Sequence, residues 1–265
     1  MTNKHAINNS KHSTNNSLLT NFAFTLAETL IVMGIIGVVA ALTLPNLNSS
    51  TGDKEKVAKL QKLYQNLNDA FGRAEAVYGP IDEWLTNNQE TSTKKTSERM
   101  LDFLKISKNC GINMNVNITD CFGSKTDLWV NGGATFILSD GSSIAINGGT
   151  FCYSDVVNNA PADIPDRNIC GSITVDIDGP NKGKNLAGHD LFSFSITKQG
   201  IIPDGGEYRI DTYDDNIKHY CLADLDNGIL CTSWVLKAGN MDYLKTKNGK
   251  CPNGTELSWS NLSCN

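Results

Sequence analysis

Residues 24–44 read FTLAETLIVMGIIGVVAALTL, an apolar run of 21 residues in which Glu28 is the one charged residue. As an α-helix, a run of this length spans about 30 Å, which matches the hydrocarbon thickness of a bilayer. Residues 1–23 contain Lys4 and Lys11 but no acidic residue, and such positive charge keeps the N-terminus of an inserted segment in the cytoplasm. We therefore expect a transmembrane segment, with the longer C-terminal part of the chain outside the cytoplasm.

This apolar run does not end like a secretory signal peptide. A signal peptide has an A-x-A-like cleavage site after its apolar stretch, whereas this chain continues as PNLNSSTGDKEK after Leu44. Within the run, the carboxylate of Glu28 is costly, and such groups usually have a partner. Two interpretations of Glu28 are open: it reaches the membrane interface, or it neutralises a positive charge on another group.

Residues 23–47, AFTLAETLIVMGIIGVVAALTLPNL, resemble the processing and assembly segment of type IV prepilins and type II secretion pseudopilins. The resemblance implies that residues 1–23 are a prepilin leader peptide, which prepilin peptidase removes by cutting between Ala23 and Phe24. Phe24 then becomes the N-methylated first residue of the mature chain. Most members of the family have glycine before the cut, and this chain departs from them at Ala23.

The same resemblance implies roles for two further residues. Glu28 matches the glutamate that the family carries near its mature N-terminus, where the carboxylate can pair during assembly with the new amine of a neighbouring subunit. Pro45 matches the helix-bending proline of many type IV pilins, because a proline inside a helix removes a hydrogen bond and kinks the helix.

Beyond Pro45 the chain carries one apolar stripe with helical spacing. Its members recur at alternating steps of three and four residues, which indicates an amphipathic helix, and the Gly79-Pro80 pair ends it. We expect one long helix over residues 24–78, whose second half packs against a globular head; a free coiled coil is the alternative. The stripe consists of Val57, Leu60, Tyr64, Leu67, Phe71, Ala74 and Tyr78.

Residues 79–265 form the expected disulfide-rich head. Its first 22 residues, 79–100, read as a polar loop before a short helix near residues 100–104. ATFILS and SSIAIN, on either side of Asp140-Gly141, predict a β-hairpin. The expected strands are 134–139, 142–147, 172–177 and 192–197.

The end of the chain adds a second helical signal. TSWVLKAGNMDYL, residues 232–244, is expected to be helical in part, with an interruption at Gly239. An antiparallel sheet of about four strands packed on one long helix is an α+β arrangement. We therefore expect a pilin-like α+β fold, in which the first half of the helix lies in the membrane.

The composition argues against several classes of function. The chain has 265 residues, with 23 Lys+Arg against 28 Asp+Glu and a net charge of −5, and nucleic-acid binding favours a basic protein. The chain contains no Gly-x-Ser-x-Gly, His-Glu-x-x-His or phosphate-loop motif. His189 is next to Asp190, but no nucleophile can be identified for this pair. We therefore expect no enzymatic activity.

Eight cysteines lie downstream of the apolar run, on the side predicted to be outside the cytoplasm, where disulfides persist. None forms a Cys-x-x-Cys pair, so the spacing of zinc ribbons and thioredoxin-type sites is missing. Many connectivities are possible; we favour short loops in sequence order, and free buried thiols are the alternative. HYCLADLDNGILCTSW also resembles the tail of cysteine-rich pilin-like proteins, which supports the third pair. The predicted pairs are Cys110–Cys121, Cys152–Cys170, Cys221–Cys231 and Cys251–Cys264.

The stretch VDIDGPNKGKNLAGHD, residues 175–190, places several oxygen donors in a glycine-rich loop, and hard cations such as Ca²⁺ prefer oxygen ligands. The loop lacks the bidentate glutamate that ends an EF-hand loop. It also resembles a segment of pilin-like heads, and some pseudopilins hold calcium in a loop of their sheet. Calcium is the one cofactor we consider, and an ordinary Asx/Gly turn is the alternative. The candidate ligands are Asp176, Asp178, Asn181 and Asp190.

Two classes of function remain. The first is a structural subunit that is processed by prepilin peptidase, held in the bacterial inner membrane by a single span, and polymerised into a type IV pilus or a secretion pseudopilus. Its head would lie in the periplasm or outside, and its partners would be other pilin-like subunits and the inner-membrane assembly machinery, with no nucleic acid. The second is a single-pass membrane-anchored protein whose disulfide-rich head binds a ligand.

Overall fold

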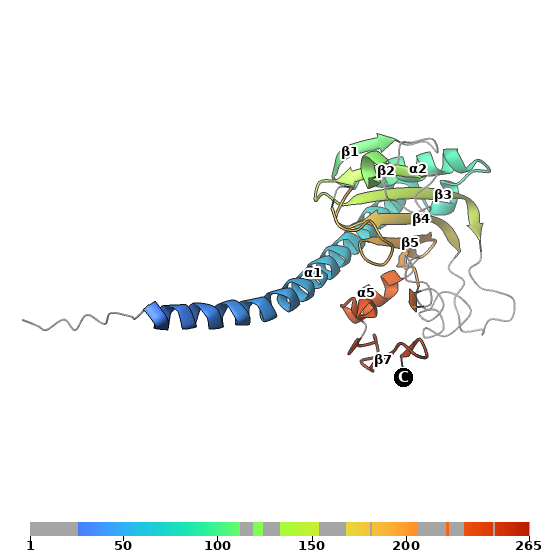
Figure 1. The fold of residues 1–265 in the computed structure, drawn as a ribbon. Helices are drawn as coiled ribbons and strands as arrows, with labels where there is room; N and C mark the ends of the chain where they lie inside the picture. Colours follow the sequence, from blue (N-terminus) through green and yellow to red (C-terminus); the bar gives the residue numbers. More distant parts are fainter. Residues whose placement is uncertain are drawn as a thin grey trace, which may run out of the picture. The chain divides into compact units, whose positions relative to one another are not determined.

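A computed structural model describes most of the chain (Figure 1). The chain divides into two compact units, residues 1–48 and 49–265, and we call the second one the head unit. The described residues are 26–111, 119–123, 133–153, 168–180, 182–205, 221–222, 231–245 and 247–264. Within the first helix, the side chains of residues 28 and 39–51 are outside this description.

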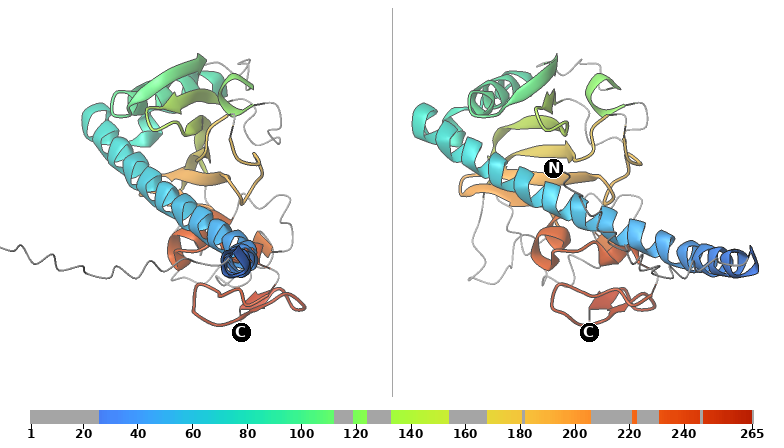
Figure 2. Two further views of the ribbon diagram at one scale, coloured as in Figure 1. Left: turned by 60° about the vertical axis from the view of Figure 1, so that its left-hand side comes forward. Right: turned by 90° about the vertical axis from the view of Figure 1, so that its left-hand side faces the viewer.

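Helix α1 covers Leu26–Tyr78, 53 residues. In the head unit its apolar stripe faces the core, where Leu60 and Leu67 are fully buried. Tyr64 stacks on Phe194 of the sheet, with 5.5 Å between the ring centroids. Figure 2 shows this part of α1 running across one face of the sheet. The stripe is therefore a packing surface within the chain, and the coiled-coil alternative is wrong.

The expected membrane-spanning half of the helix is not found. Among the described residues, no helix combines the length and the apolar character needed to cross a membrane. The pilin-like fold class and the single-pass inner-membrane localisation both assumed a transmembrane segment at 24–44, and both expectations are wrong.

A six-stranded antiparallel sheet, with its strands in sequence order, forms the centre of the head unit. The predicted hairpin is confirmed: Gly141 has a φ of 90° in its turn, and the Asp140 carboxylate accepts hydrogen bonds from Ser142. The two strands at the sheet edges, β1 and β6, were not predicted. The strands are β1 (Ile106–Gly111), β2 (Ala134–Leu138), β3 (Ser143–Tyr153), β4 (Ile169–Asp176), β5 (Leu191–Thr197) and β6 (Gly200–Pro203).

The two faces of this sheet differ in chemistry, because side chains alternate between the faces along each strand. The face toward α1 buries large apolar side chains such as Phe136, Ile144 and Phe194. A small cluster around Phe122, in α3 (Thr119–Phe122), packs on the opposite face. That opposite face carries mostly small polar side chains: Thr135, Ser143, Asn147, Ser172, Thr174, Asp176, Ser193 and Ser195.

Helix α2 (Gln89–Leu101) replaces the polar loop expected in this part of the chain. Asn88 caps it, because its Oδ1 accepts a hydrogen bond of 2.8 Å from the backbone N–H of Thr91. The helix lies so close to β3 that a Cβ on Gly148 would be 2.7 Å from the carbonyl carbon of Ser92. Small side chains permit this approach. The buried stripe of α2 consists of Ser92, Thr93, Thr96, Ser97 and Met100.

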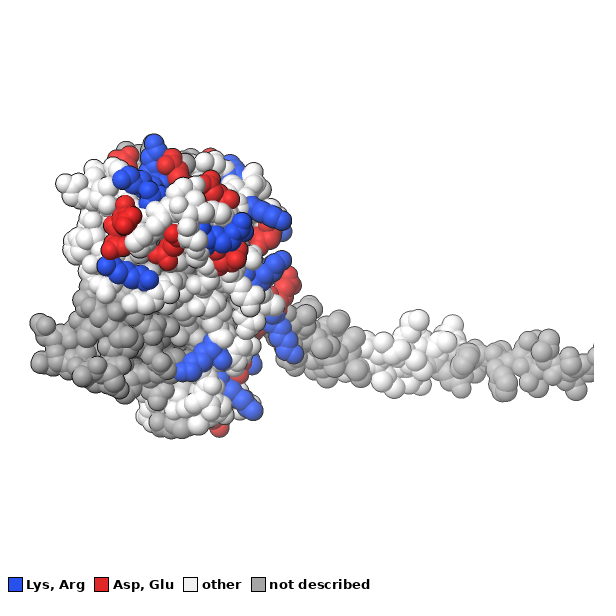
Figure 3. Space-filling view, turned by 180° about the vertical axis from the view of Figure 1, so that it is seen from behind, with Lys and Arg blue, Asp and Glu red and all other residues white. Residues whose placement is uncertain are grey.

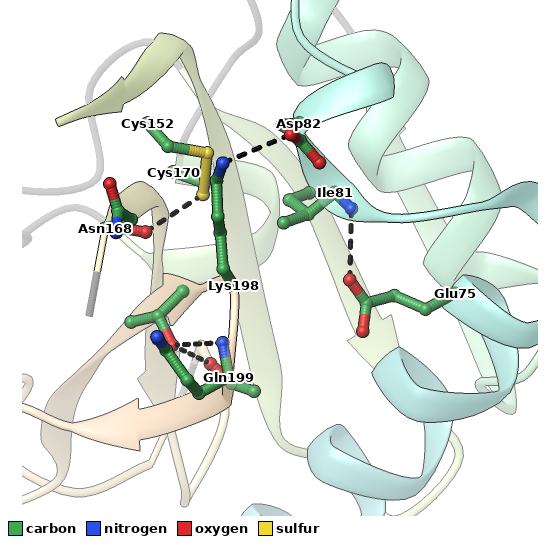
Figure 4. The surroundings of a disulfide bond; sticks show 10 residues. Glu75, Ile81, Asp82, Cys152, Asn168, Cys170, Lys198 and Gln199 are labelled. Carbon is green, nitrogen blue, oxygen red and sulfur yellow. Dashed lines mark hydrogen bonds and ion pairs between the residues drawn. A yellow bond between two sulfur atoms is a disulfide. The ribbon is translucent and has the colours of Figure 1, made fainter. Parts of the chain in front are cut away.

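Four disulfides join the eight cysteines in sequence order, which confirms the predicted pairing and excludes free thiols. Figure 4 shows Cys152–Cys170, which links β3 to β4. Nearby, Lys198 of the β5–β6 turn lies 3.1 Å from Asp82 of the short helix η1 (Ile81–Glu83). The disulfide thus closes a short loop, whereas the ion pair joins segments that are 116 residues apart in sequence.

The C-terminal part is helical in part, as predicted. Helix α5 (Thr232–Ala238) ends at Gly239, whose φ of 63° lies in the left-handed region that favours glycine. The short helix η5 (Asp242–Leu244) follows. Two short strands, β7 (Leu257–Ser258) and β8 (Ser263–Cys264), pair next to the last disulfide.

Candidate assembly surface and acidic loop

The start of α1, Leu26–Val38, exposes its apolar side chains, and we call it the apolar segment. The exposed fractions range from 53% at Val32 to 78% at Leu26. Because a helix has about 3.6 residues per turn, four consecutive residues cover every side of it, and residues 30–33 are all exposed. The exposed apolar side chains are Leu26, Leu30, Ile31, Val32, Met33, Ile35, Ile36 and Val38.

The apolar segment has the properties of a contact surface. Contiguous exposed apolar patches of this kind mark sites of protein–protein or membrane interaction. At Gly34 and Gly37, an added Cβ would meet no atom within 4 Å, so another helix can approach the backbone closely there. The charged side chains that Figure 3 shows lie on the head unit, where both signs are interspersed. The described part of the segment offers apolar contact and no charge.

The residues predicted for processing and assembly lie at or near this segment. Ala23 and Phe24 are outside the described residues. Glu28 and Pro45 lie within the bounds of α1, but their side chains are outside the described part of the chain. Cleavage, methylation, the pairing of Glu28 and the bend at Pro45 therefore stay predictions.

The candidate calcium loop follows β4, and its first carboxyl group is deeply buried. Asp176 is fully buried, and its Oδ1 accepts hydrogen bonds from the backbone N–H groups of Asp178 (3.0 Å) and Gly179 (2.9 Å). Its Oδ2 is buried without a hydrogen-bond partner. Burial is the main cause that raises the pKa of Asp176 to about 7, because the charged form loses its hydration.

Asp190, at the other end of the loop, is buried with both carboxylate oxygens engaged. Oδ2 accepts hydrogen bonds from the backbone N–H groups of Lys184 and Asn185, and Oδ1 accepts one from Leu186. These three hydrogen bonds fix the position of the side chain within the loop. The Asp190 side chain is therefore bonded to three consecutive residues of the loop, 184–186.

Asp178 faces α1 instead. Its Oδ2 lies 3.3 Å from Nζ of Lys56, and its Oδ1 lies 3.3 Å from Nζ of Lys59. Lys56 also donates a hydrogen bond of 3.1 Å to the backbone carbonyl of His189. This loop is thus tied to the helix by charge, across more than 100 residues of sequence.

The described residues of the loop do not fit a calcium ion. Ca²⁺ takes about six to eight oxygen ligands. Both oxygens of Asp178 and of Asp190 are engaged, which leaves Asp176 Oδ2 and Asn185 Oδ1 as buried carboxyl or amide oxygens without a partner. Asn181 lies outside the described residues, and within these no group of three or more His, Cys, Asp or Glu side chains could hold a metal ion.

Sequence reasoning treated Asp176, Asp178 and Asp190 as one set of metal ligands, and it missed the backbone N–H groups and lysines that contact them. Lys56 and Lys59 lie three residues apart on α1 and therefore share a face of the helix. That spacing was a signal for a common partner, but it did not identify Asp178.

Comparisons with protein family models, with curated proteins and with solved structures found no match to this chain.

Proposed function

We propose that the protein is a structural subunit of the prepilin and pseudopilin class, which is cut before Phe24 and polymerises with other subunits through the apolar segment. The exposed apolar segment is the observation that carries this proposal. Each large apolar side chain gains about 1.5–3 kcal/mol when it is fully buried. A bundle of packed helices would bury side chains that are exposed on every side of a helix.

Two further features support the proposal. The first is the resemblance of residues 23–47 to the processing segment of prepilins, with Glu28 in the position of the family glutamate. The second is the set of four disulfides in the head unit, since disulfides persist in oxidising compartments outside the cytoplasm. Filament subunits work in such compartments, and the partners we propose are prepilin peptidase and further copies of pilin-like chains.

A matched pair of substitutions tests the role of the segment. Val38 and Val77 lie on the same helix and are exposed to nearly the same extent, 62% and 63%, but only Val38 belongs to the apolar segment. In a shearing and sedimentation assay for filaments, Val38→Asp should abolish assembly because a carboxylate is costly in an apolar interface. Val77→Asp should assemble like the wild type. Equal assembly of the two variants would contradict the proposal.

Processing is tested separately, by intact-mass analysis of the mature chain made in cells that contain prepilin peptidase. The expected mass is that of a chain beginning with N-methylated Phe24. A mature chain that retains residues 1–23 would contradict the processing step.

A further inference from the structure

Lys56 belongs to α1, and its ammonium group contacts two oxygen atoms of the acidic loop. Its ammonium group lies 3.3 Å from a carboxylate oxygen of Asp178 and 3.1 Å from the backbone carbonyl oxygen of His189. Carboxylate and backbone carbonyl oxygens are two of the ligand types that Ca²⁺ uses. Lys56 thus supplies positive charge to the same kinds of oxygen, from a helix that is already part of the core.

Lys59 completes the neutralisation of Asp178. Its Nζ lies 3.3 Å from the second oxygen of Asp178 and 3.2 Å from Glu55, one helical turn earlier on α1. The side chain of Asp178 is only 12% exposed, whereas that of Lys59 is 45% exposed. The lysines therefore bring charge from the helix surface to a nearly buried carboxylate.

We infer that the ammonium groups of Lys56 and Lys59 take the place of a divalent cation at Asp178, so that the loop is latched to α1 at this residue without calcium. The backbone N–H groups that surround Asp190 and Asp176 provide the remaining compensation. Asp178 is the one loop carboxylate that needs charge from outside the loop. This inference does not depend on the proposed function, because it concerns the fold of one subunit.

The first test compares thermal unfolding of the full chain in CaCl₂ with unfolding in EDTA. A ligand that binds only the folded state raises the melting temperature. If the loop holds no calcium at Asp178, the wild type and Asp178→Asn should respond to calcium alike, and terbium luminescence, excited through the tryptophans, should report the same binding to both. A melting temperature that calcium raises in the wild type but not in Asp178→Asn, or a terbium ion that only the wild type binds, would overturn the inference.

The second test removes the ammonium groups. Lys56→Met and Lys59→Met keep the long side chain but remove the charge, and Lys62→Met is the matched control on an exposed position of the same helix. In EDTA, we expect the double Lys56→Met/Lys59→Met variant to melt about 4–8 °C below the wild type, because Asp178 is left without its counter-charges. The control should melt within about 1 °C of the wild type. If the double variant melts like the control, the latch is refuted.

Discussion

The two ends of α1 belong to one helix but differ in the exposure of their apolar side chains. From Leu26 to Val38 these side chains are more than half exposed, whereas Val57, Leu60 and Leu67 are buried against the sheet. The patterns differ accordingly: the first part is apolar on every side, and the second carries one stripe. One sheet of the same chain is enough to bury a single apolar stripe. An all-round apolar surface is fully buried only when it is surrounded on all sides.

The largest effect should come from the buried part of α1. Phe71 is 2% exposed and lies against Trp84, with 5.8 Å between the ring centroids. Phe71→Ala should lower the free energy of unfolding by about 3–5 kcal/mol, because it leaves a cavity in the core. Leu30→Ala, in the exposed segment, should change it by less than about 0.5 kcal/mol. Denaturant unfolding of the dispersed full chain measures both changes. Similar losses of unfolding free energy in the two variants would show that the two parts of α1 do not differ in their contribution to stability.

A substitution in the apolar segment should instead affect assembly. Glu28→Ala leaves the amine of a neighbouring Phe24 without a counter-charge in the assembled state, at a cost of about 3–5 kcal/mol. The unfolding free energy of the dispersed subunit should stay unchanged, because Glu28 is far in sequence from the buried stripe. Filament yield should therefore fall, whereas the free energy measured by denaturant unfolding should not change. Normal filament yield from Glu28→Ala would show that the pairing is not needed.

The pH dependence of stability should come from the head unit. Asp176 has a pKa raised from 3.8 to about 7 in the folded state, so between these values the folded chain binds the proton and the unfolded chain releases it. Stability therefore falls as pH rises from about 4 to about 7 and is then constant, with a loss of roughly 2–4 kcal/mol from this group. Asp176→Asn keeps the Oδ1 acceptor, and it should flatten this dependence and be the more stable protein at pH 8.

Asp190→Asn is the control for that experiment. Asp190 accepts three backbone hydrogen bonds with its two oxygens, and an amide retains only one of these acceptors. This variant should be less stable than the wild type at pH 8, because it loses at least one of these hydrogen bonds. A pH profile that is unchanged in Asp176→Asn would show that another group causes the slope.

The smallest effect should come from glycines of α1 with open surroundings. An added Cβ at Gly72 meets no atom within 4 Å, so Gly72→Ala should stabilise the subunit by about 0.5–1 kcal/mol through helix propensity. Gly34→Ala adds the same methyl group to the apolar segment, where close helix approach would be hindered. It should therefore lower filament yield, which Gly72→Ala should not do. Equal filament yields would show that close packing at Gly34 is not required.

Local patterns were sufficient to predict the parts of the head that obey local rules. Asp140-Gly141 between two alternating runs predicted the β2–β3 hairpin, and the stripe on α1 predicted its buried face. Helix α2 was missed because four of the five residues in its buried stripe are Ser or Thr. These residues have helical spacing, but they are polar, whereas the buried face of a helix is usually apolar. Because α2 lies close to β3 at Gly148, only small side chains fit between them. The sequence does not show that these two segments are in contact.

The edge strands and the acidic loop show the same limit. Strand β6 has only four residues, and β1 is exposed at three consecutive positions and has two register irregularities. Neither strand therefore carries a clear alternation of polar and apolar residues. In the loop, the sequence showed several oxygen-bearing side chains, but it did not show the backbone amides and distant lysines that contact Asp176, Asp178 and Asp190. Charge compensation depends on contacts between residues such as Lys59 and Asp178, which are 119 positions apart.

The most direct test of the central claim, that other subunits cover the apolar segment, is the oxidation of Met33 by hydroxyl radicals, followed by mass spectrometry. Met33 is 74% exposed in the single chain, and Met100, which is fully buried, is the internal control. Met33 should be oxidised rapidly in dispersed subunits and protected in assembled filaments, while Met100 stays protected in both. Equal oxidation of Met33 in the two states would contradict the account.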